Sequence, residues 1–373
     1  MPRPVALIDN VCDPQYPATS GHSDIIWAMA QNLSSRGYEV SVVAPYSAVP
    51  FDAGPIRIIP FTPIAKRNNV ITQSLTALRA ALLAKRYPGQ IYHVTDAFSA
   101  GAAGLVGLKP LVFTTSGNVY QRIHSGVGLD WSAKIGYKFW SRLAAAKADA
   151  VLYTSQDMQQ WWKRTGMSDA RSHFVPLGVN AEFFTPRNSQ PGSQKYPFLA
   201  ISRLAPENNV DRLLEIVAQP SLKNLDFSVQ IAGDGALRPQ LVRQANELGI
   251  AHHINWLGHI EYNDLPQLYQ SSRALLFTRE EGAPPRVVLQ ALSSGIPVLS
   301  FNSSGISDYV QHQVSGLLAP LGKIQTFAEN IELCLKDDEL IHQMGKNARL
   351  SVEQRFNWPR VIDQIITVYH QFG

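Results

Sequence analysis

The chain of 373 residues has only two cysteines, Cys12 and Cys334, which lie far apart and form no metal-binding or redox motif. No stretch approaches the roughly 18 consecutive apolar residues of a membrane span. The first residues run straight into a strand-like segment and do not resemble a signal peptide. We therefore expect a cytoplasmic protein without structural disulfides.

Motifs of several common enzyme classes are also missing from the sequence. No Gly-x-Gly-x-x-Gly follows the first strand-like segment, which argues against an NAD enzyme. Neither a Walker P-loop nor the Gly-x-Ser-x-Gly of hydrolases occurs. His252, His253 and His312 have no metal-ligand partners at a useful spacing. We expect no metal site, no bound cofactor and no nucleic-acid partner.

Acidic residues are scarce in the first half of the chain. Residues 1–195 hold 19 Lys and Arg against 11 Asp and Glu, whereas residues 196–373 hold 14 against 18. This asymmetry suggests that the halves meet different partners. A basic first half suits an acidic acceptor or peripheral contact with the inner face of an anionic membrane. A merely solvated basic face is an equally good interpretation.

One helix-like segment in the first half, residues 131–148, carries two stripes. Trp131, Ile135 and Phe139 form an apolar stripe beside Lys134, Lys138 and Arg142. Such a helix could lie on a membrane surface. We favour the alternative that its apolar stripe packs on its own domain.

Strand-like apolar runs alternate with helix-period stripes in both halves. This alternation predicts right-handed βαβ crossovers and parallel sheets. The fold class is therefore α/β, with two doubly wound, Rossmann-like domains facing a cleft. The expected strands are 5–9, 39–44, 57–60, 91–94, 111–115, 198–202, 227–232, 254–256, 274–277 and 297–301. The expected helices are 24–37, 71–85, 131–148, 157–165, 210–218, 237–248 and 264–271.

The segment 187–196 is rich in Pro, Gly, Ser and Gln, which is typical of an interdomain linker. It separates a first domain of residues 1–186 from a second domain that begins at residue 197. Two cores also suit a chain of this length better than one.

The most informative stretch is residues 273–320. An apolar run ends in two adjacent carboxylates, Glu280 and Glu281, and a Gly-Ala-Pro-Pro break leads into a helix that begins near Arg286. Carboxylates accept hydrogen bonds from sugar hydroxyls, while the free N–H groups and dipole of a helix N-terminus favour phosphate. The stretch therefore predicts a binding site for a nucleotide sugar.

Further segments, in order along the chain, resemble the retaining family 4 glycosyltransferases, which have the GT-B fold. They are Gly21, residues 175–180, 202–207 and 233–235, Glu281-Gly282, and residues 356–358. The resemblance implies a metal-independent retaining hexosyltransferase with a UDP- or GDP-linked donor and a glycan, glycolipid or small-molecule acceptor. A role in glycolipid or polysaccharide synthesis follows. The first domain would bind the acceptor and residues 197–355 the donor, with a terminal helix at 356–373 crossing back to the first domain.

The resemblance also implies roles for particular residues. Arg203 would bind the diphosphate through two hydrogen bonds and stabilise the leaving group, and Glu281 would bond the donor sugar, although Glu280 is an alternative. The expected donor contacts are Gly21, Arg203, Asn208, Gly233, Leu257, Glu281, Arg286, Val287, Val288 and Gln290. His93 is the expected catalytic histidine because it ends a strand near Asp96. Ser116, His22 and Asp96 would lie on the acceptor side.

Three positions depart from the family pattern. Gln290 replaces the second glutamate, Asn208 stands where the family has a lysine, and Ser116 stands where it has a histidine. Arg286 or Arg279 could replace the lysine, and His22, His93 or His124 the histidine. The departures motivate two alternatives: a catalytically impaired binding protein, or an enzyme of the same fold that uses a sugar phosphate donor.

Overall fold

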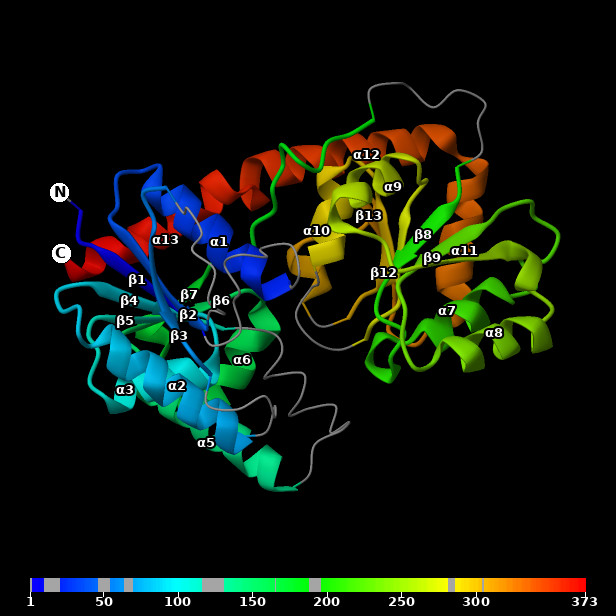
Figure 1. Cartoon of the computed structure of the whole chain (residues 1–373). Helices are drawn as coiled ribbons and strands as arrows, with labels where there is room; N and C mark the ends of the chain where they lie inside the picture. Colours follow the sequence, from blue (N-terminus) through cyan, green and yellow to red (C-terminus); the bar gives the residue numbers. More distant parts are fainter. Residues whose placement is uncertain are drawn as a thin grey trace. The chain divides into compact units, whose positions relative to one another are not determined.

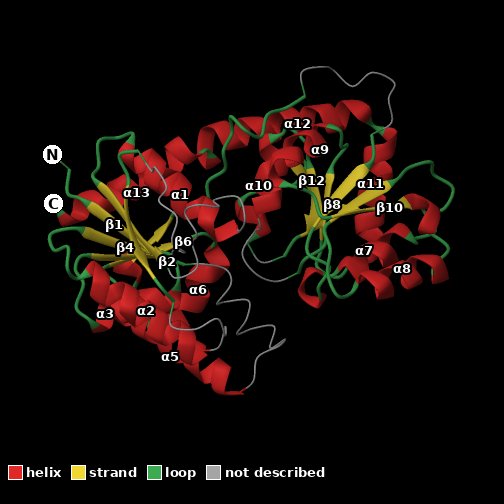
Figure 2. Ribbon diagram, viewed as in Figure 1, coloured by secondary structure: helices red, strands yellow, loops and turns green. Residues whose placement is uncertain are grey.

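The computed structural model describes residues 2–9, 21–45, 54–63, 70–115, 131–164, 166–187, 196–280, 286–303 and 305–373. The chain divides into two compact units (Figure 1). The first unit comprises Met1–Gly178 and Trp358–Gly373, and the second comprises Val179–Asn357. Most of the predicted linker, residues 188–195, lies outside the described residues. In both units helices flank a parallel sheet (Figure 2).

The first unit is built on a seven-stranded parallel sheet in the order β3-β2-β1-β4-β5-β6-β7. Its strands are β1 (Val5–Ile8), β2 (Val40–Pro45), β3 (Arg57–Phe61), β4 (Ile91–Val94), β5 (Leu111–Thr114), β6 (Ala150–Tyr153) and β7 (Ser172–Phe174). Its helices are α1 (Gly21–Ser34), α2 (Val70–Ala84), α3 (Ala97–Leu105), α5 (Trp131–Lys147), α6 (Gln156–Arg164) and α13 (Trp358–Tyr369).

Helices cover both faces of this sheet, which explains why its central strands are continuous apolar runs. All four residues of β1 are buried. Val5 and Leu7 point into a core that also contains the apolar sides of α1 and α13. Neighbouring residues of a strand point to opposite faces, so Ala6 and Ile8 face the layer of α2, α3 and α5. A strand buried on both faces cannot alternate apolar and polar residues.

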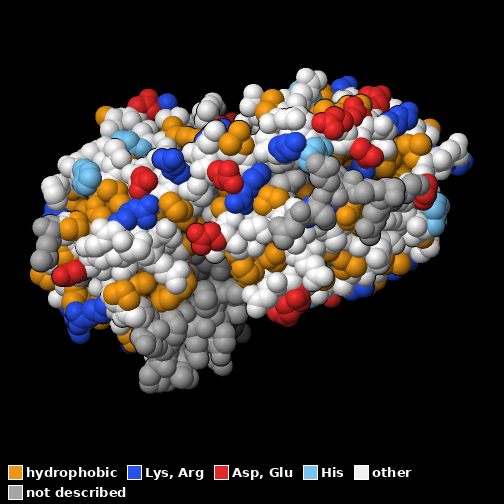
Figure 3. Space-filling model, turned by 90° about the horizontal axis from the view of Figure 1, so that it is seen from above, with side chains coloured by type: hydrophobic (Ala, Val, Ile, Leu, Met, Phe, Trp, Pro, Cys, Tyr) orange, Lys and Arg blue, Asp and Glu red, His pale blue; other side chains and the backbone are white. Residues whose placement is uncertain are grey.

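The last helix, α13, returns to the first unit and packs beside α1. Trp358, Val361 and Ile365 join the same buried core as Ile26 and Met29 of α1. At the surface of this helix pair, Arg36 forms an ion pair of 2.9 Å with Asp363. Seen from this side, basic and acidic side chains are interspersed over the first unit (Figure 3). The chain end is therefore a structural part of the first unit.

The second unit contains a six-stranded parallel sheet in the order β10-β9-β8-β11-β12-β13. Its strands are β8 (Phe198–Ile201), β9 (Val229–Ala232), β10 (Ile254–Gly258), β11 (Leu275–Phe277), β12 (Val298–Phe301) and β13 (Gly316–Ala319). Its helices are α7 (Val210–Val217), α8 (Arg238–Glu247), α9 (Leu265–Gln270), α10 (Arg286–Ser293), α11 (Ile324–Lys336) and α12 (Asp338–Ser351).

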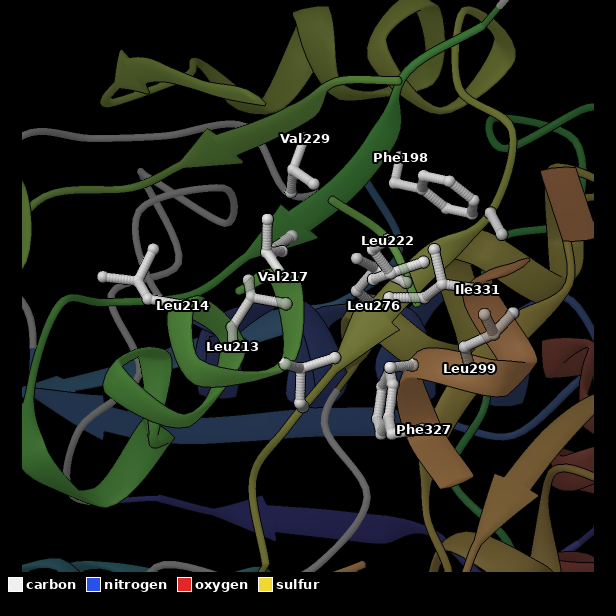
Figure 4. Packing of buried hydrophobic residues seen from close by; sticks show 14 of the residues in the cluster. Phe198, Leu213, Leu214, Val217, Leu222, Val229, Leu276, Leu299, Phe327 and Ile331 are labelled. Atoms are coloured by element: carbon white, nitrogen blue, oxygen red, sulfur yellow. The ribbon is translucent and has the colours of Figure 1, made fainter. Parts of the chain in front are cut away.

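The core of the second unit joins the sheet to α7 and α11 (Figure 4). Leu213 and Val217 of α7 meet Phe198 and Leu276 of the sheet, and Phe327 of α11 closes the cluster. Because Phe198 and Leu276 come from the neighbouring strands β8 and β11, this core fixes the loops that follow those two strands.

Candidate functional site

The carboxyl ends of the central strands of the second unit bring several predicted residues to one edge of the sheet. Arg203 lies two residues beyond β8, and Arg279 lies two residues beyond β11. These strands are neighbours, and the strand order reverses between them. In open parallel sheets ligands bind at such a switch point, outside the carboxyl ends of the strands. The topology therefore places two arginines where a ligand is expected.

Glu207 connects the two arginines electrostatically. It forms an ion pair with Arg203, whose side chain is 72% exposed. Burial lowers the pKa of the Arg279 guanidinium to about 10, and the nearby Glu207 carboxylate opposes that shift. Arg279 is therefore still charged at neutral pH although it has lost much of its hydration. Two arginines thus lie beside Glu207, and both carry N–H donors that an anionic ligand can use.

Asn208 braces the loop between β8 and α7. Its side-chain amide donates a hydrogen bond of 2.6 Å to the backbone oxygen of Arg203. The hydroxyl of Thr278, the first residue after β11, bonds the backbone oxygens of Asn208 and Asn209 at 3.3 and 3.0 Å. These bonds fix the loop that carries Arg203 to the end of the strand that carries Arg279. The neutral residue at position 208 thus contributes order to the site and no charge.

Gly233, which follows β9, allows two loops to approach each other closely. A Cβ atom built on it would lie 1.9 Å from the backbone oxygen of Ser202, and its φ of +128° is unfavourable for other residues. Its N–H also donates to the backbone oxygen of Gly258 at 2.6 Å. Glycine is required here for packing of the β8 and β9 loops, whatever the ligand.

Helix α10 begins at Arg286, so Arg286 and Val287 lie in its first turn, with Val288 buried behind them. Before it, Glu280 is half-buried, and its buried Oε1 atom accepts no hydrogen bond from any residue that the structure describes. A carboxylate and a helix N-terminus thus flank the undescribed residues 281–285. Such an arrangement can bind both hydroxyl and phosphate groups.

Two models of known families match the chain, one after the other. The model described as Glycosyltransferase Family 4 matches residues 19–183, and the model described as Glycosyl transferases group 1 matches residues 183–351. The chain is a glycosyltransferase of the group 1/family 4 type.

Two relatives show how far the similarity extends. An uncharacterized glycosyltransferase of Haemophilus influenzae is 26% identical over 212 residues, which are 57% of this chain and 58% of that protein. The UDP-Gal:α-D-GlcNAc-diphosphoundecaprenol α-1,3-galactosyltransferase of Escherichia coli is 25% identical over 328 residues, or 83% of this chain and 82% of that protein.

Solved structures show the GT-B fold for this glycosyltransferase. Sucrose-phosphate synthase from Thermosynechococcus elongatus superposes with a TM-score of 0.82 at 18% identity, covering 99% of both chains. Anabaena HepE in complex with UDP superposes with a TM-score of 0.76 at 18% identity, covering 99% of this chain and 100% of that chain. The predicted architecture of two Rossmann-like α/β parts in a GT-B fold is confirmed.

Gln290 of the glycosyltransferase is buried in α10 and bonded to α9. Its Oε1 atom accepts a hydrogen bond of 3.0 Å from the hydroxyl of Tyr269. The same hydroxyl lies 3.2 Å from the backbone oxygen of Val287. Residues 288–293 all lie on buried positions of α10. The oxygen of Gln290 therefore holds α10 against α9, and a contact between Gln290 and the donor stays a prediction.

His93 is also placed differently from the prediction. It is fully buried in β4, with Nδ1 2.5 Å from the hydroxyl of Tyr369 and Nε2 2.7 Å from that of Thr114. Asp96, which was expected beside it, caps α3 by accepting a 2.9 Å hydrogen bond from the N–H of Ser99. With both ring nitrogens engaged inside the core, His93 is unsuited to contact a sugar.

Several other predicted site residues lie outside the described residues or at the edges of helices and strands. Glu281, Ser116 and His124 lie outside the described residues, as does the side chain of His22. Gly21 is the first residue of α1, three residues before the predicted start of that helix. Leu257 lies in β10, one residue before Gly258. Among the described residues no group of three or more His, Cys, Asp or Glu side chains could hold a metal ion. None of the described helices has the length and apolar character needed to cross a membrane.

The buried His93 predicts a pH dependence of stability. Burial lowers its pKa from 6.5 to about 3, so the unfolded chain binds a proton that the folded chain excludes between these values. This contribution to stability is complete above pH 6.5 and is lost progressively as the pH falls from 6.5 to about 3, by roughly 1 kcal/mol for each pH unit. Chemical denaturation at several pH values should show a shallower decline for His93→Gln. Tyr369→Phe removes the same hydrogen bond but keeps the titrating ring, and should retain the steep decline; equal slopes for both variants would contradict the assignment.

Proposed function

We propose that this glycosyltransferase is a retaining, metal-independent hexosyltransferase that moves a sugar from a UDP- or GDP-linked donor to an acceptor hydroxyl. The observation that carries the proposal is the pair of arginines, Arg203 and Arg279, on neighbouring loops at the switch point of the second sheet. Such a pair suits the diphosphate of a nucleotide sugar, which carries two negative charges and gains a third as it leaves.

The chemistry needs stabilisation of charge on that leaving group. As the bond from the anomeric carbon to the phosphate oxygen breaks, negative charge develops on the diphosphate. Arg203, which keeps much of its exposure, can present its planar fork to two phosphate oxygens. Arg279 supplies the second cation, and its lost hydration strengthens its interaction with phosphate. The acceptor oxygen attacks the face that the diphosphate leaves, and its proton passes to a phosphate oxygen.

The relatives support a nucleotide sugar as donor and a lipid-linked or polysaccharide acceptor. The E. coli relative uses UDP-Gal and α-D-GlcNAc-diphosphoundecaprenol, and the Anabaena protein binds UDP. We therefore rank a uridine donor before a guanosine donor. The basic charge of residues 1–195 is compatible with an acidic acceptor or with an anionic membrane that carries it.

Polar groups in the first unit support acceptor binding at the carboxyl edge of its sheet. Asp9 follows β1 and accepts a 2.8 Å hydrogen bond from the hydroxyl of Thr95, which follows β4. Thr115 follows β5, and its buried hydroxyl has no hydrogen-bond partner among the described residues. We propose that an acceptor hydroxyl binds near this edge, with Asp96 and the undescribed Ser116 and His22 close by.

The test of donor binding is thermal stabilisation by UDP-, GDP-, ADP- and TDP-sugars, with and without Mg²⁺ and a chelator. A donor at about 100 times its dissociation constant should stabilise the protein by about 2.7 kcal/mol. Arg203→Ala should lose this shift, whereas Arg243→Ala, which removes an exposed arginine of α8, should keep it. A shift that survives in Arg203→Ala, or that requires Mg²⁺, would contradict the proposed site.

A binding protein without transferase activity is the second candidate, and the departures from the family pattern at Asn208, Ser116 and Gln290 favour it. Transfer assays separate the two candidates. A donor-induced shift without hydrolysis or transfer would support the binding protein. A shift with a sugar 1-phosphate alone would instead indicate an enzyme with a sugar phosphate donor.

A further inference from the structure

Helices α2, α3 and α5 form one layer on the first sheet, and this layer exposes an unusual number of apolar side chains. Six of the ten large apolar residues that are exposed in the described part of the chain belong to it. They are Ile71, Leu75 and Leu82 of α2, Leu105 of α3, and Ile135 and Phe139 of α5. Ile71 is 70% exposed and Ile135 57%. Scattered apolar residues are ordinary on a protein surface, whereas a contiguous group indicates an interaction site.

The two outer helices of this layer lie against each other. A Cβ atom built on Gly136 of α5 would lie only 2.3 Å from the Cγ1 atom of Val70 in α2. The hydroxyl of Tyr137 in α5 donates to the side chain of Gln73 in α2 at 3.2 Å. Residues 97–103 of α3 are buried behind them. The exposed stripes of α2 and α5 therefore belong to one surface.

The charges of this surface all have the same sign. The sequences of α2, α3 and α5 contain no Asp or Glu, but they contain Arg79, Lys134, Lys138, Arg142 and Lys147. None of these five forms an ion pair with a described residue. The opposite side of the unit differs, because Arg36 there pairs with Asp363. Cations that have no acidic partner among the described residues, beside exposed apolar groups, are the features of a surface that binds anionic lipid.

Helix α5 also shapes this surface. A hollow of about 530 Å³ is lined by Ile135, Phe139 and Leu143 on one stripe and by Lys138 and Arg142 on the next. Ile135 and Phe139 are the residues that were expected to pack on their own domain, and they are exposed instead. The next residue of α5, Trp140, is the one that is buried, and it fills the space beside Gly101 of α3.

We propose that the surface formed by α2 and α5 docks on an anionic lipid bilayer, with the apolar side chains among the acyl chains and the basic side chains at the headgroups. A symmetric dimer through this surface would place its basic residues against one another, which is unfavourable. A nucleic acid would match the charge but not the exposed Ile, Leu and Phe side chains. The inference deepens the membrane contact of the proposed function, but lipid binding can be tested without any assumption about donor or acceptor.

The experiment is co-sedimentation of the full chain with vesicles of phosphatidylcholine alone or mixed with phosphatidylglycerol. The protein should bind the anionic vesicles, and raised salt should weaken binding. Ile135→Ser with Phe139→Ser tests the apolar component, and Lys138→Gln with Arg142→Gln tests the charge. Each pair should reduce partitioning by about tenfold or more. The control is Leu333→Ser with Leu350→Ser, two exposed leucines of the second unit, which should bind like the unchanged protein.

The inference is overturned if the unchanged protein does not bind anionic vesicles or binds neutral vesicles equally well. It is also overturned if both surface variants bind anionic vesicles as well as the unchanged protein does. Formation of dimers that the Phe139 variant abolishes, without lipid binding, would assign the surface to a second copy instead. Donor-induced thermal stabilisation of the same variants distinguishes a failure of this inference from a failure of the proposed function. A variant that keeps that stabilisation but loses vesicle binding supports the inference, whereas absence of any donor effect in a vesicle-binding protein contradicts only the proposed function.

Discussion

Arg279→Ala should reduce sugar transfer by about 10²- to 10³-fold, the loss expected when one preorganised donor to a developing anion is removed. In this chain the position that the family fills with a lysine holds Asn208, whose amide is committed to the backbone oxygen of Arg203. Arg279 lies on the adjacent loop, remains charged at neutral pH and is already partly desolvated. We therefore expect Arg279 to carry the role of the absent lysine. Steady-state kinetics with the donor that stabilises the protein will measure the effect.

The design must separate loss of catalysis from loss of loop structure. Arg279→Lys keeps a cation but not the fork, and should retain part of the activity. Adding Asn208→Lys to Arg279→Ala should restore activity partly, because position 208 is held next to the end of β11 by Thr278. Arg243→Ala is the control for a general charge effect. Unchanged kcat in Arg279→Ala, or an equal loss in Arg243→Ala, would refute the role of Arg279.

The outline of both sheets could be predicted from the sequence because buried parallel strands are short apolar runs. Two of the elements that escaped prediction lack such a signal. Helix α3, with the sequence AFSAGAAGL, is buried along most of its length between α2, α5 and the sheet, so it has no polar side and no helical period. Strand β7 contains only Ser172–Phe174, and its three residues, S-H-F, are not an apolar run. The prediction also omitted β6, β13, α11 and α12, although β6 and β13 are apolar runs as long as the predicted β1 and β4.

The resemblance to the family 4 glycosyltransferases implied the role of Arg203, which follows an apolar run. Its link to Arg279 through Glu207 depends on β8 and β11 being neighbours, which the sequence does not state. His93 was misjudged because Tyr369, which buries it, lies in the last helix of the chain. In both cases the deciding partner is remote in sequence, and only the topology brings it close.

Gly233→Ala should cost about 3 kcal/mol or more of stability, the second large effect that we expect. The added methyl group would lie 1.9 Å from the backbone oxygen of Ser202, and backbone cannot move aside as a flexible side chain can. Gly249→Ala is the control at an open position, because Gly249 has a less restricted positive φ, of +71°, and nothing lies within 4 Å of its Cβ position. That variant should cost only about 1–2 kcal/mol.

Chemical denaturation of the two variants compares a crowded glycine with an open one, and the difference contains both the steric cost and the greater backbone cost of φ +128°. A larger loss in Gly233→Ala would show that the loops after β8 and β9 are pressed together, and hence that the backbone next to Arg203 has one fixed position. Equal losses would mean that these loops separate readily. Arg203 would then have no rigid support, and its orientation toward a diphosphate would have to come from the ligand itself.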